Sequence, residues 1–226
     1  MKLTWSQQLF FFLNKKHGQR IWFDQFMVFA AQYLIVLHIA IIILATFFIL
    51  ADQQWILFEL FVKETMFLVA VALVTSYTIG WVVPHRRPIR EFPQTSLLFH
   101  TLKTWKSFPS DHTIMVFSTW GMFLWFSLLW LDDLARVRYS ILIFLIVTFV
   151  SAALVAFSRI YCGVHYPRDI LGGILIAAFY VWLFESSVHW WNILYVNGWA
   201  IALVLAVVLV FGYHRRIIRF ISSRLS

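Results

Sequence analysis

The stretch that decides the fold is residues 139–157, with the sequence YSILIFLIVTFVSAALVAF, and it contains no charged side chain. As an α-helix it would be about 28 Å long, at about 1.5 Å per residue. The hydrocarbon core of a bilayer is about 30 Å thick and takes roughly 17–25 apolar residues to cross. We therefore expect this segment to cross a membrane as one helix.

The composition of the whole chain agrees with a membrane protein. Of the 226 residues, 62% are hydrophobic and 12% are charged, whereas soluble domains average about 45–50% and about 25%. This excludes a disordered protein, a disulfide scaffold and an ordinary soluble domain. The single cysteine, Cys162, cannot form an internal disulfide, and no Cys/His cluster indicates zinc. The net charge of +8 suits residues that flank spans, meet anionic headgroups or bind a phosphorylated substrate.

Six windows meet or approach the length of a transmembrane helix. They lie at residues 27–51, 57–83, 112–131, 139–157, 169–190 and 195–213. We expect one integral-membrane domain, residues 1–226, folded as an all-α, polytopic bundle of about six transmembrane helices. Residues 1–23 are expected to be an interfacial N-terminal segment, with a short amphipathic helix at residues 4–13. His38, deep in the first span, is expected to be a neutral histidine bonded to a neighbouring helix.

Three polar clusters lie at the ends of these spans: residues 84–90 (PHRRPIR), 108–112 (FPSDH) and 158–169 (SRIYCGVHYPRD). Residues 84–111 form the one long loop, and loops of that length are usually functional or disordered. An up-and-down path places the second and fourth loops on one membrane face, so all three clusters can meet. Singly, each cluster has a simpler interpretation, as headgroup-anchoring arginines, as an N-cap at Ser110 or Asp111, or as Pro167 in the first turn of a helix.

Together, these side chains suit a phosphoryl group. Arginine forks match phosphate oxygens bidentately, and the expected helix N-termini at residues 110–112 and 167–169 add backbone donors. One histidine can attack phosphorus and form a covalent intermediate, and a second can protonate the leaving oxygen and then activate water. Asp169 lies four residues beyond His165, so a helical turn between them would let the carboxylate hold the ring. No metal and no cofactor are required.

The clusters resemble the three-part signature of the type 2 phosphatidic acid phosphatase superfamily, the lipid phosphate phosphatases. In that family the parts are Lys-x6-Arg-Pro, Pro-Ser-Gly-His and Ser-Arg-x5-His-x3-Asp. Here Arg87-Pro88 matches the end of the first part, residues 109–112 (PSDH) match the second, and residues 158–169 match the third at full spacing. The resemblance covers roughly residues 80–169, and the six-span layout agrees with it.

The resemblance implies roles for individual residues in a metal-independent phosphatase. His165 is the nucleophile that becomes a phosphohistidine, Asp169 orients it, and His112 protonates the leaving group and then activates water. The residues implied for holding the phosphate oxygens are Arg87, Ser110 and Arg159, with the backbone of Asp111 assisting.

Two positions depart from the signature. The signature lysine falls on Gly80, and Arg86 or Arg90 is the expected replacement, so Arg86 is included among the substrate-binding candidates. The signature glycine is Asp111. In the long loop, His100, Lys103 and Lys106 are expected either to meet lipid phosphates or to face solvent.

The Ser-Asp-His version of the second part, preceded by Phe-Pro, resembles the bacterial undecaprenyl-diphosphate phosphatases of the bacitracin-resistance type. It implies hydrolysis of a polyprenyl diphosphate to the monophosphate and inorganic phosphate, in recycling of the cell-wall carrier lipid. A phosphatidate, phosphatidylglycerol phosphate or lipid A phosphatase is an alternative with the same chemistry. An alternative of another class is a non-catalytic membrane carrier that binds anions.

The expected partners are a membrane lipid phosphate and the bilayer, with no nucleic acid, and the oligomeric state is not predicted. The resemblance implies a multi-pass protein of the bacterial plasma (inner) membrane. Both expected termini are basic and lie on the side of the clusters, so the positive-inside rule favours a cytoplasmic site. The resemblance favours an extracytoplasmic site instead, and both alternatives stay open.

Overall fold

The computed structural model describes residues 3–50, 55–83, 85–99, 106–130 and 138–186. Nearly all of them belong to one compact unit, Met1–Leu183. The regular secondary structure within these ranges is helical, which confirms the expected all-α membrane fold, and the expected span at residues 195–213 lies outside them. The helices are α1 (Trp5–Asn14), α2 (Ile21–Gln32), α3 (Leu34–Leu50), α4 (Trp55–Val82), α5 (Pro88–Glu91), α6 (Asp111–Trp130), α7 (Arg138–Tyr161) and α8 (Pro167–Ser186).

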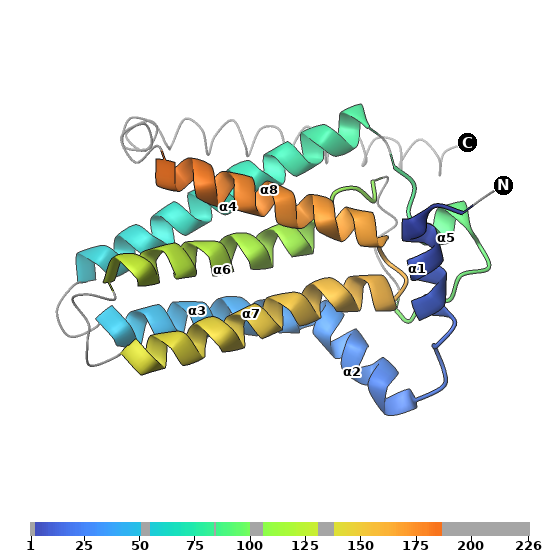
Figure 1. Ribbon diagram of the computed structural model, residues 1–226, viewed down its shortest axis with the longest axis horizontal. Coiled ribbons are helices and arrows are strands. Elements are labelled where there is room, and N and C mark those ends of the chain that lie inside the picture. The colour runs from blue at the N-terminus through green and yellow to red at the C-terminus, as the bar shows by residue number, and fades with distance from the viewer. Residues whose placement is uncertain (1–2, 51–54, 84, 100–105, 131–137, 187–226) are drawn as a thin grey trace, which may run out of the picture. The chain divides into compact units, whose positions relative to one another are not determined.

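Helix α6 lies at the centre of the compact unit. It contacts α3, α4 and α7, and α3 also packs against α4 and α7. Figure 1 shows these four helices and α8 running lengthwise, with α1 and α5 at the end where α6 and α8 begin. Helix α8 approaches α6 at Val181, which lies against Gly121, and α4 at Tyr180, whose hydroxyl is 2.5 Å from that of Thr75. The polar clusters therefore lie at one end of the unit.

The lengths of the helices agree with most of the expected spans. Among the described helices, Asp111–Leu129, Tyr139–Tyr161 and Pro167–Glu185 are long and apolar enough to cross a bilayer, and the bent pair of α2 and α3 makes a fourth if it is one span. Helix α4 has 28 residues. Its charged residues lie near its beginning, as expected for the entrance of a span, where Lys63 pairs with Glu59.

The first span differs from its prediction. The sequence predicts one helix over residues 27–51, but α2 ends at Gln32, α3 begins at Leu34, and their axes differ by 56°. At the break, the carbonyl oxygen of Ala31 accepts a hydrogen bond from Nη1 of Arg159 at 3.0 Å. In an unbroken helix, that carbonyl would accept from the backbone N–H four residues later. A side chain of the third polar cluster thus donates a hydrogen bond to a backbone carbonyl of the first span. The apolar pattern of the sequence alone cannot indicate this contact.

Helix α1 matches the predicted N-terminal amphipathic helix. On one face, Phe10 is fully buried against the ring of Tyr166, and the hydroxyl of Ser6 accepts from the backbone N–H of Arg168 at 3.2 Å. Its exposed side chains include three large apolar ones, those of Trp5, Leu9 and Phe12. This exposed face suits the membrane interface predicted for residues 1–23.

His38 is the fully buried histidine of the first span. Its Nδ1 is 2.6 Å from the hydroxyl of Ser151, and its Nε2 is 3.1 Å from the carbonyl oxygen of Val116 and 3.0 Å from the hydroxyl of Thr119. These partners belong to α6 and α7, so the expected bonding to neighbouring helices is confirmed. The histidine ties three helices together in the apolar core.

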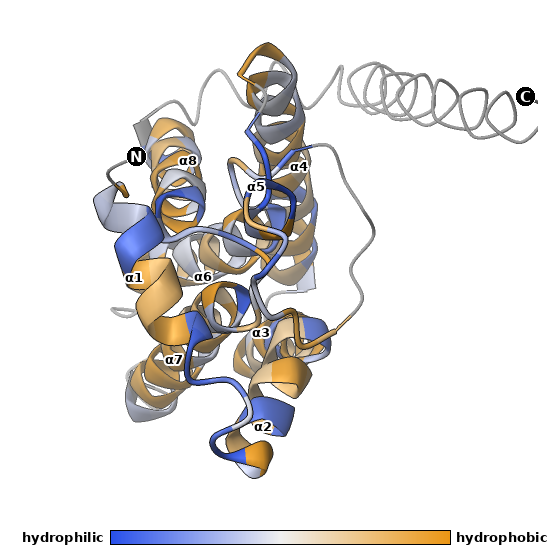
Figure 2. Ribbon diagram, turned by 90° about the vertical axis from the view of Figure 1, so that its right-hand side faces the viewer, coloured by the Kyte–Doolittle hydropathy of each residue, from blue (hydrophilic) through white to orange (hydrophobic). Residues whose placement is uncertain are grey.

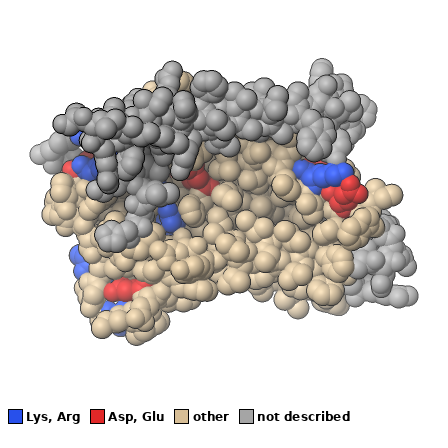
Figure 3. All heavy atoms as spheres, turned by 180° about the vertical axis from the view of Figure 1, so that it is seen from behind, with Lys and Arg blue, Asp and Glu red and all other residues tan. Residues whose placement is uncertain are grey.

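The outward surface of the long helices is largely apolar. Figure 2 looks at the end with the polar clusters and shows hydrophilic residues mainly in loops and at helix ends, with hydrophobic helices behind them. On the face drawn in Figure 3, few of the described side chains are charged. Ile146 of α7 and Leu175 of α8 are 64% and 70% exposed. Exposed apolar side chains in a long helix indicate contact with lipid.

Candidate active site

The beginnings of α6 and α8 are tied together through the backbone. The N–H of Ser110 donates to the carbonyl of Asp169 at 3.1 Å. The carbonyl of Ser110 accepts from the N–H of Ile114, so Ser110 occupies the N-cap of α6. Pro167 is the first residue of α8, where its missing N–H and fixed φ are tolerated. Two helix N-termini, each with a positive dipole end, therefore adjoin.

A tight reversal after α7 places His165. Helix α7 ends at Tyr161, and Gly163 has a φ of +84°, in the left-handed region that glycine adopts at the least cost. The N–H groups of Val164 and His165 then both donate to the carbonyl of Arg159 at 3.1 Å. The spacing Ser-Arg-x5-His thus corresponds to a helix end followed by a turn that folds back on it.

Asp169 is fully buried, and its carboxylate holds this turn. Its Oδ2 accepts from the hydroxyl of Ser107 at 2.6 Å and from the N–H of Tyr166 at 2.9 Å, and it lies 3.5 Å from Nδ1 of His165. Burial lowers the pKa of His165 below the usual 6.5, and the nearby carboxylate of Asp169 opposes this only in part. The ring is therefore neutral near pH 7, and a proton held at Nδ1 by the carboxylate leaves the lone pair on Nε2.

His112 and the two predicted arginines lie around the same point. His112 is in the first turn of α6, close enough to His165, Arg159 and Arg87 for their charges to act on it. Arg159 likewise lies close enough to Arg87 and Asp111 for their charges to act on it. The structure therefore brings residues of all three clusters together at the ends of the helices, as the sequence predicts.

Each arginine is anchored by one donor and has another that is unused. Nε of Arg87 donates to the carbonyl of Lys106 at 3.2 Å, as Nη1 of Arg159 does to that of Ala31. Nη1 of Arg87 and Nε of Arg159 are buried and have no hydrogen-bond partner among the described residues. Buried donors are normally satisfied, and guanidinium groups match phosphate oxygens. These donors therefore indicate an anion-binding site.

Some of the predicted residues are not gathered there. Arg86, which precedes α5, and Arg90, within α5, are both exposed. The charge of Arg90 acts on Arg87, whereas no contact among the described residues joins Arg86 to the other site residues, so its role in substrate binding stays a prediction. His100 and Lys103 lie outside the described residues.

Two side chains at the site, Ser107 and Arg168, are not indicated by the sequence, and a third, Lys106, differs from one of its two expected placements. Ser107 donates to Asp169, and its only signal in the sequence is that it directly precedes FPSDH. Arg168 lies inside the third cluster, with Nη2 3.2 Å from Nδ1 of His85 and Nε 3.9 Å from Oδ1 of Asp169. Lys106 is buried, which is inconsistent with the expected solvent-facing loop and leaves contact with lipid phosphates as a prediction.

Other chemistries have less support in the described part of the chain. No group of three or more His, Cys, Asp or Glu side chains is placed there to hold a metal ion. Cys162 is buried, and burial raises the pKa of its thiol to about 12. A thiol of such high pKa is protonated at neutral pH and is a poor nucleophile.

Comparisons with known proteins agree with this arrangement. Residues 62–193 match the family described as the PAP2 superfamily. The chain is 28% identical over 208 residues to YbjG of Escherichia coli K12, which carries the provisional name of an undecaprenyl-diphosphatase; the match covers 84% of this chain and 94% of YbjG. It is 30% identical over 161 residues to the undecaprenyl-diphosphatase BcrC of Bacillus subtilis 168, covering 71% of this chain and 72% of BcrC.

Two solved structures share the fold. LpxE of Aquifex aeolicus superposes with a TM-score of 0.57 at 20% identity, covering 82% of this chain and 97% of LpxE. A PAP2 type phosphatidylglycerolphosphate phosphatase from Bacillus subtilis superposes with a TM-score of 0.54 at 22% identity, covering 80% and 86% of the two chains. At these identities the likeness concerns the fold, which is the expected helical membrane architecture.

Proposed function

Since this chain belongs to the PAP2 superfamily and is an integral membrane phosphatase, we propose that it hydrolyses a polyprenyl diphosphate of the undecaprenyl type to the monophosphate and inorganic phosphate. The observation that carries the proposal is the group of two helix N-termini, two histidines and two arginines at one end of the helices. We propose that the reaction passes through a phosphohistidine on His165.

In the first step, Nε2 of His165 attacks the terminal phosphorus. A P–N bond forms while the bond from phosphorus to the bridging oxygen breaks. His112 gives its proton to that oxygen, so the lipid leaves as the monophosphate. The carboxylate of Asp169 stabilises the positive charge that develops on the ring of His165.

In the second step, the neutral His112 removes a proton from water, and the oxygen of that water attacks phosphorus. The P–N bond breaks, the electron pair returns to Nε2 of His165, and inorganic phosphate is released. Arg87, Arg159 and the N-terminus of α6 at Ser110 and Asp111 balance the charge on the phosphate oxygens in both steps.

The helices explain why the substrate is a lipid. The polyprenyl tail stays in the bilayer beside their apolar surface, while the diphosphate meets the polar side chains at their ends. The two relatives named as undecaprenyl-diphosphatases support this substrate. We place the site on the extracytoplasmic face of the bacterial plasma membrane, where spent carrier lipid is recycled.

The test is phosphate release by the purified protein in detergent containing EDTA. The substrates are undecaprenyl diphosphate, phosphatidate, phosphatidylglycerol phosphate and lipid A. We expect the highest kcat/KM with undecaprenyl diphosphate and, for His165→Ala, a fall on the order of 10⁴-fold, because the covalent route is lost.

Three outcomes would contradict the proposal. A dependence on divalent metal would exclude the metal-independent route, and full activity of His165→Ala would exclude the phosphohistidine. Binding of phosphate without any hydrolysis would instead favour an anion carrier.

A further inference from the structure

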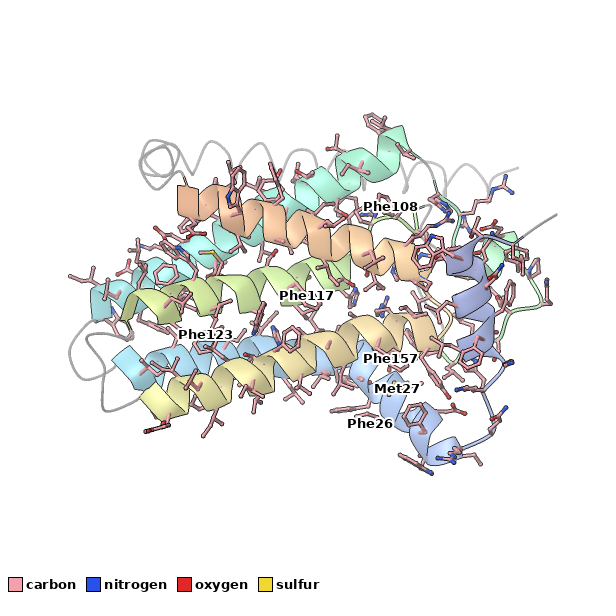
Figure 4. All side chains as sticks on the ribbon, viewed as in Figure 1. Phe26, Met27, Phe108, Phe117, Phe123 and Phe157 are labelled. Carbon is pink, nitrogen blue, oxygen red and sulfur yellow. The ribbon has the colours of Figure 1, made fainter. Side chains whose placement is uncertain are left out.

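A lysine from the long loop fills the space beside Gly80. A Cβ atom added at Gly80 would lie 2.5 Å from Cδ and 3.2 Å from Cβ of Lys106, and 3.3 Å from the carbonyl oxygen of Phe108. The side chain of Lys106 therefore crosses α4 at the one position where that helix has no side chain. Figure 4 shows Phe108, two residues further along, beside the first half of α8.

The ammonium group of Lys106 lies in the site and not in solvent. Its Nζ donates to Oδ1 of Asp111 at 2.6 Å and to the hydroxyl of Ser76 at 2.7 Å, and Ser76 itself donates to the same Oδ1 at 2.7 Å. It also lies 4.1 Å from the centre of the ring of Tyr77. The side chain of Lys106 is 4% exposed, whereas that of Asp111 is 30% exposed.

The partners of Lys106 belong to the phosphate site. The backbone carbonyl of Lys106 accepts a hydrogen bond from Nε of Arg87 at 3.2 Å. Asp111, which binds the ammonium group, directly precedes His112. The charges of Lys106 and Arg87 act on each other. Asp111 would repel an anionic substrate if its charge were unbalanced, so a cation is needed at this point for the arginines to attract phosphate.

These contacts explain both departures from the family signature with one arrangement. The signature places a lysine at position 80 and a glycine at position 111. Here position 80 is the glycine, position 111 is the acid, and a lysine from residue 106 lies over the first and binds the second. We infer that Lys106 is a substrate-binding residue that takes the place of the signature lysine, and that Asp111 positions its ammonium group beside the phosphate.

This inference rests on the proposed phosphatase function, and its first test compares two lysines. Lys106→Met removes the charge and keeps the bulk of the side chain. The matched control is Lys63→Met, which makes the same change at an exposed lysine near the other end of α4. We expect kcat/KM to fall by about 10- to 100-fold in Lys106→Met, mainly through KM, and to stay within about twofold in Lys63→Met. Lys106→Arg should recover part of the loss.

A double variant separates substrate binding from a purely structural ion pair. Lys106→Met alone leaves the carboxylate of Asp111 unbalanced, which can destabilise the fold. Lys106→Met combined with Asp111→Asn removes both charges and restores the balance. If Lys106 binds substrate, the double variant keeps the raised KM. A return of the double variant to the KM of the unaltered protein would overturn the inference.

A swap tests the position directly. Lys106→Gly opens the space over α4, and Gly80→Lys in the same chain returns the lysine to the position of the signature. We expect the swap to recover at least about tenfold in kcat/KM over Lys106→Gly alone. A swap variant that has the same thermal unfolding temperature as Lys106→Gly and no recovery would contradict the inference.

Binding of inorganic phosphate tests Lys106 apart from turnover. The readout is the rise in thermal unfolding temperature with phosphate concentration, for the unaltered protein, Lys106→Met and Lys63→Met. We expect phosphate affinity to fall about tenfold only in Lys106→Met, and equal affinities would overturn the inference. If the unaltered protein hydrolyses none of the lipid phosphates, the proposed function fails, while this comparison still decides the role of Lys106.

Discussion

The site has two sides that are built differently. On one side, His165 and Asp169 are four residues apart, and their 3.5 Å contact is made across the turn that starts α8. On the other side, Lys106 and Asp111 meet at 2.6 Å, and the lysine comes from the long loop over a glycine of α4. A pair within one helical turn is fixed by local geometry. The place of Lys106 depends instead on contacts with a distant segment, Gly80 and Ser76 of α4, so a lysine at another position of the chain can bring its charge to the same place.

Burial separates the two acids, whereas His165 and Lys106 are equally buried. Asp169 is fully buried and accepts hydrogen bonds from Ser107 and Tyr166 besides its contact with His165. Asp111 is partly exposed and bound by Lys106 and Ser76. A buried charge that loses its partners costs far more free energy than an exposed one. We therefore expect a loss of partners to cost more free energy at Asp169 than at Asp111.

The largest effect expected in this comparison is that of Asp169→Asn. The amide keeps the shape of the side chain but carries no charge, so it holds the proton on Nδ1 of His165 less strongly and does not balance the charge of the protonated ring. We expect kcat to fall by about 10²- to 10⁴-fold with a small change in KM. Both kcat and KM are measured from the steady-state hydrolysis of undecaprenyl diphosphate.

The control for this substitution is Asp24→Asn at the same end of the unit. Asp24 accepts from the hydroxyl of Tyr161 at 2.6 Å and has no contact with either histidine among the described residues. We expect its kcat to stay within about threefold, since it lies outside the reacting group. A kcat for Asp169→Asn as high as that of the control would remove Asp169 from the mechanism.

The contrast between the two sides also explains what the sequence could predict. Residues 158–169 carry the proposed nucleophile, His165, and its acid, Asp169, at fixed spacing, so the sequence alone indicates their contact. The long apolar windows likewise predict α6, α7 and α8. The contact of His165 with Asp169 and the three helices are both determined by residues that are close in the sequence. Features of this kind can therefore be predicted from the sequence.

Contacts between distant segments could not be predicted in this way. At the bend between α2 and α3, Arg159 donates a hydrogen bond to the carbonyl of Ala31, which is 128 residues away along the chain. The place of the Lys106 side chain depends on Gly80, where α4 has no side chain. From the sequence, Arg86 and Arg90 are the expected replacements instead, and both lie nearer to Arg87 along the chain. Apolar patterns and motif spacing do not record which loop residue lies over which helix.

A smaller effect, in Ser107→Ala, tests how tightly the His165 side is held. The substitution removes the 2.6 Å hydrogen bond to Oδ2 of Asp169. Hydrogen bonds to charged groups contribute about 1.5–3 kcal/mol, and partners of this kind change activity by about 10- to 100-fold. We expect both the thermal unfolding temperature and kcat to fall.

Ser151→Ala serves as the matched control, since it also loses a 2.6 Å hydrogen bond, to His38 in the apolar core. It should lower the unfolding temperature to a similar extent and leave kcat within about threefold, because it is remote from the reacting group. If both variants lose kcat equally, the loss reflects general destabilisation and not the positioning of Asp169.

The smallest effect concerns pH and isolates the Lys106 side. Burial lowers the pKa of Lys106 below its usual 10.5, although the charge of Asp111 opposes the shift. As pH rises through this lowered pKa, the ammonium group loses its proton, and its attraction for phosphate is lost before pH 10.5. Lys106→Arg stays charged over that range, because the pKa of a guanidinium group exceeds about 12. We therefore expect the affinity for inorganic phosphate, measured by thermal shift, to fall at alkaline pH more steeply in the unaltered protein than in Lys106→Arg. Other groups titrate equally in both proteins, so the difference between the two curves belongs to Lys106, and superimposable curves would mean that its charge does not act on phosphate.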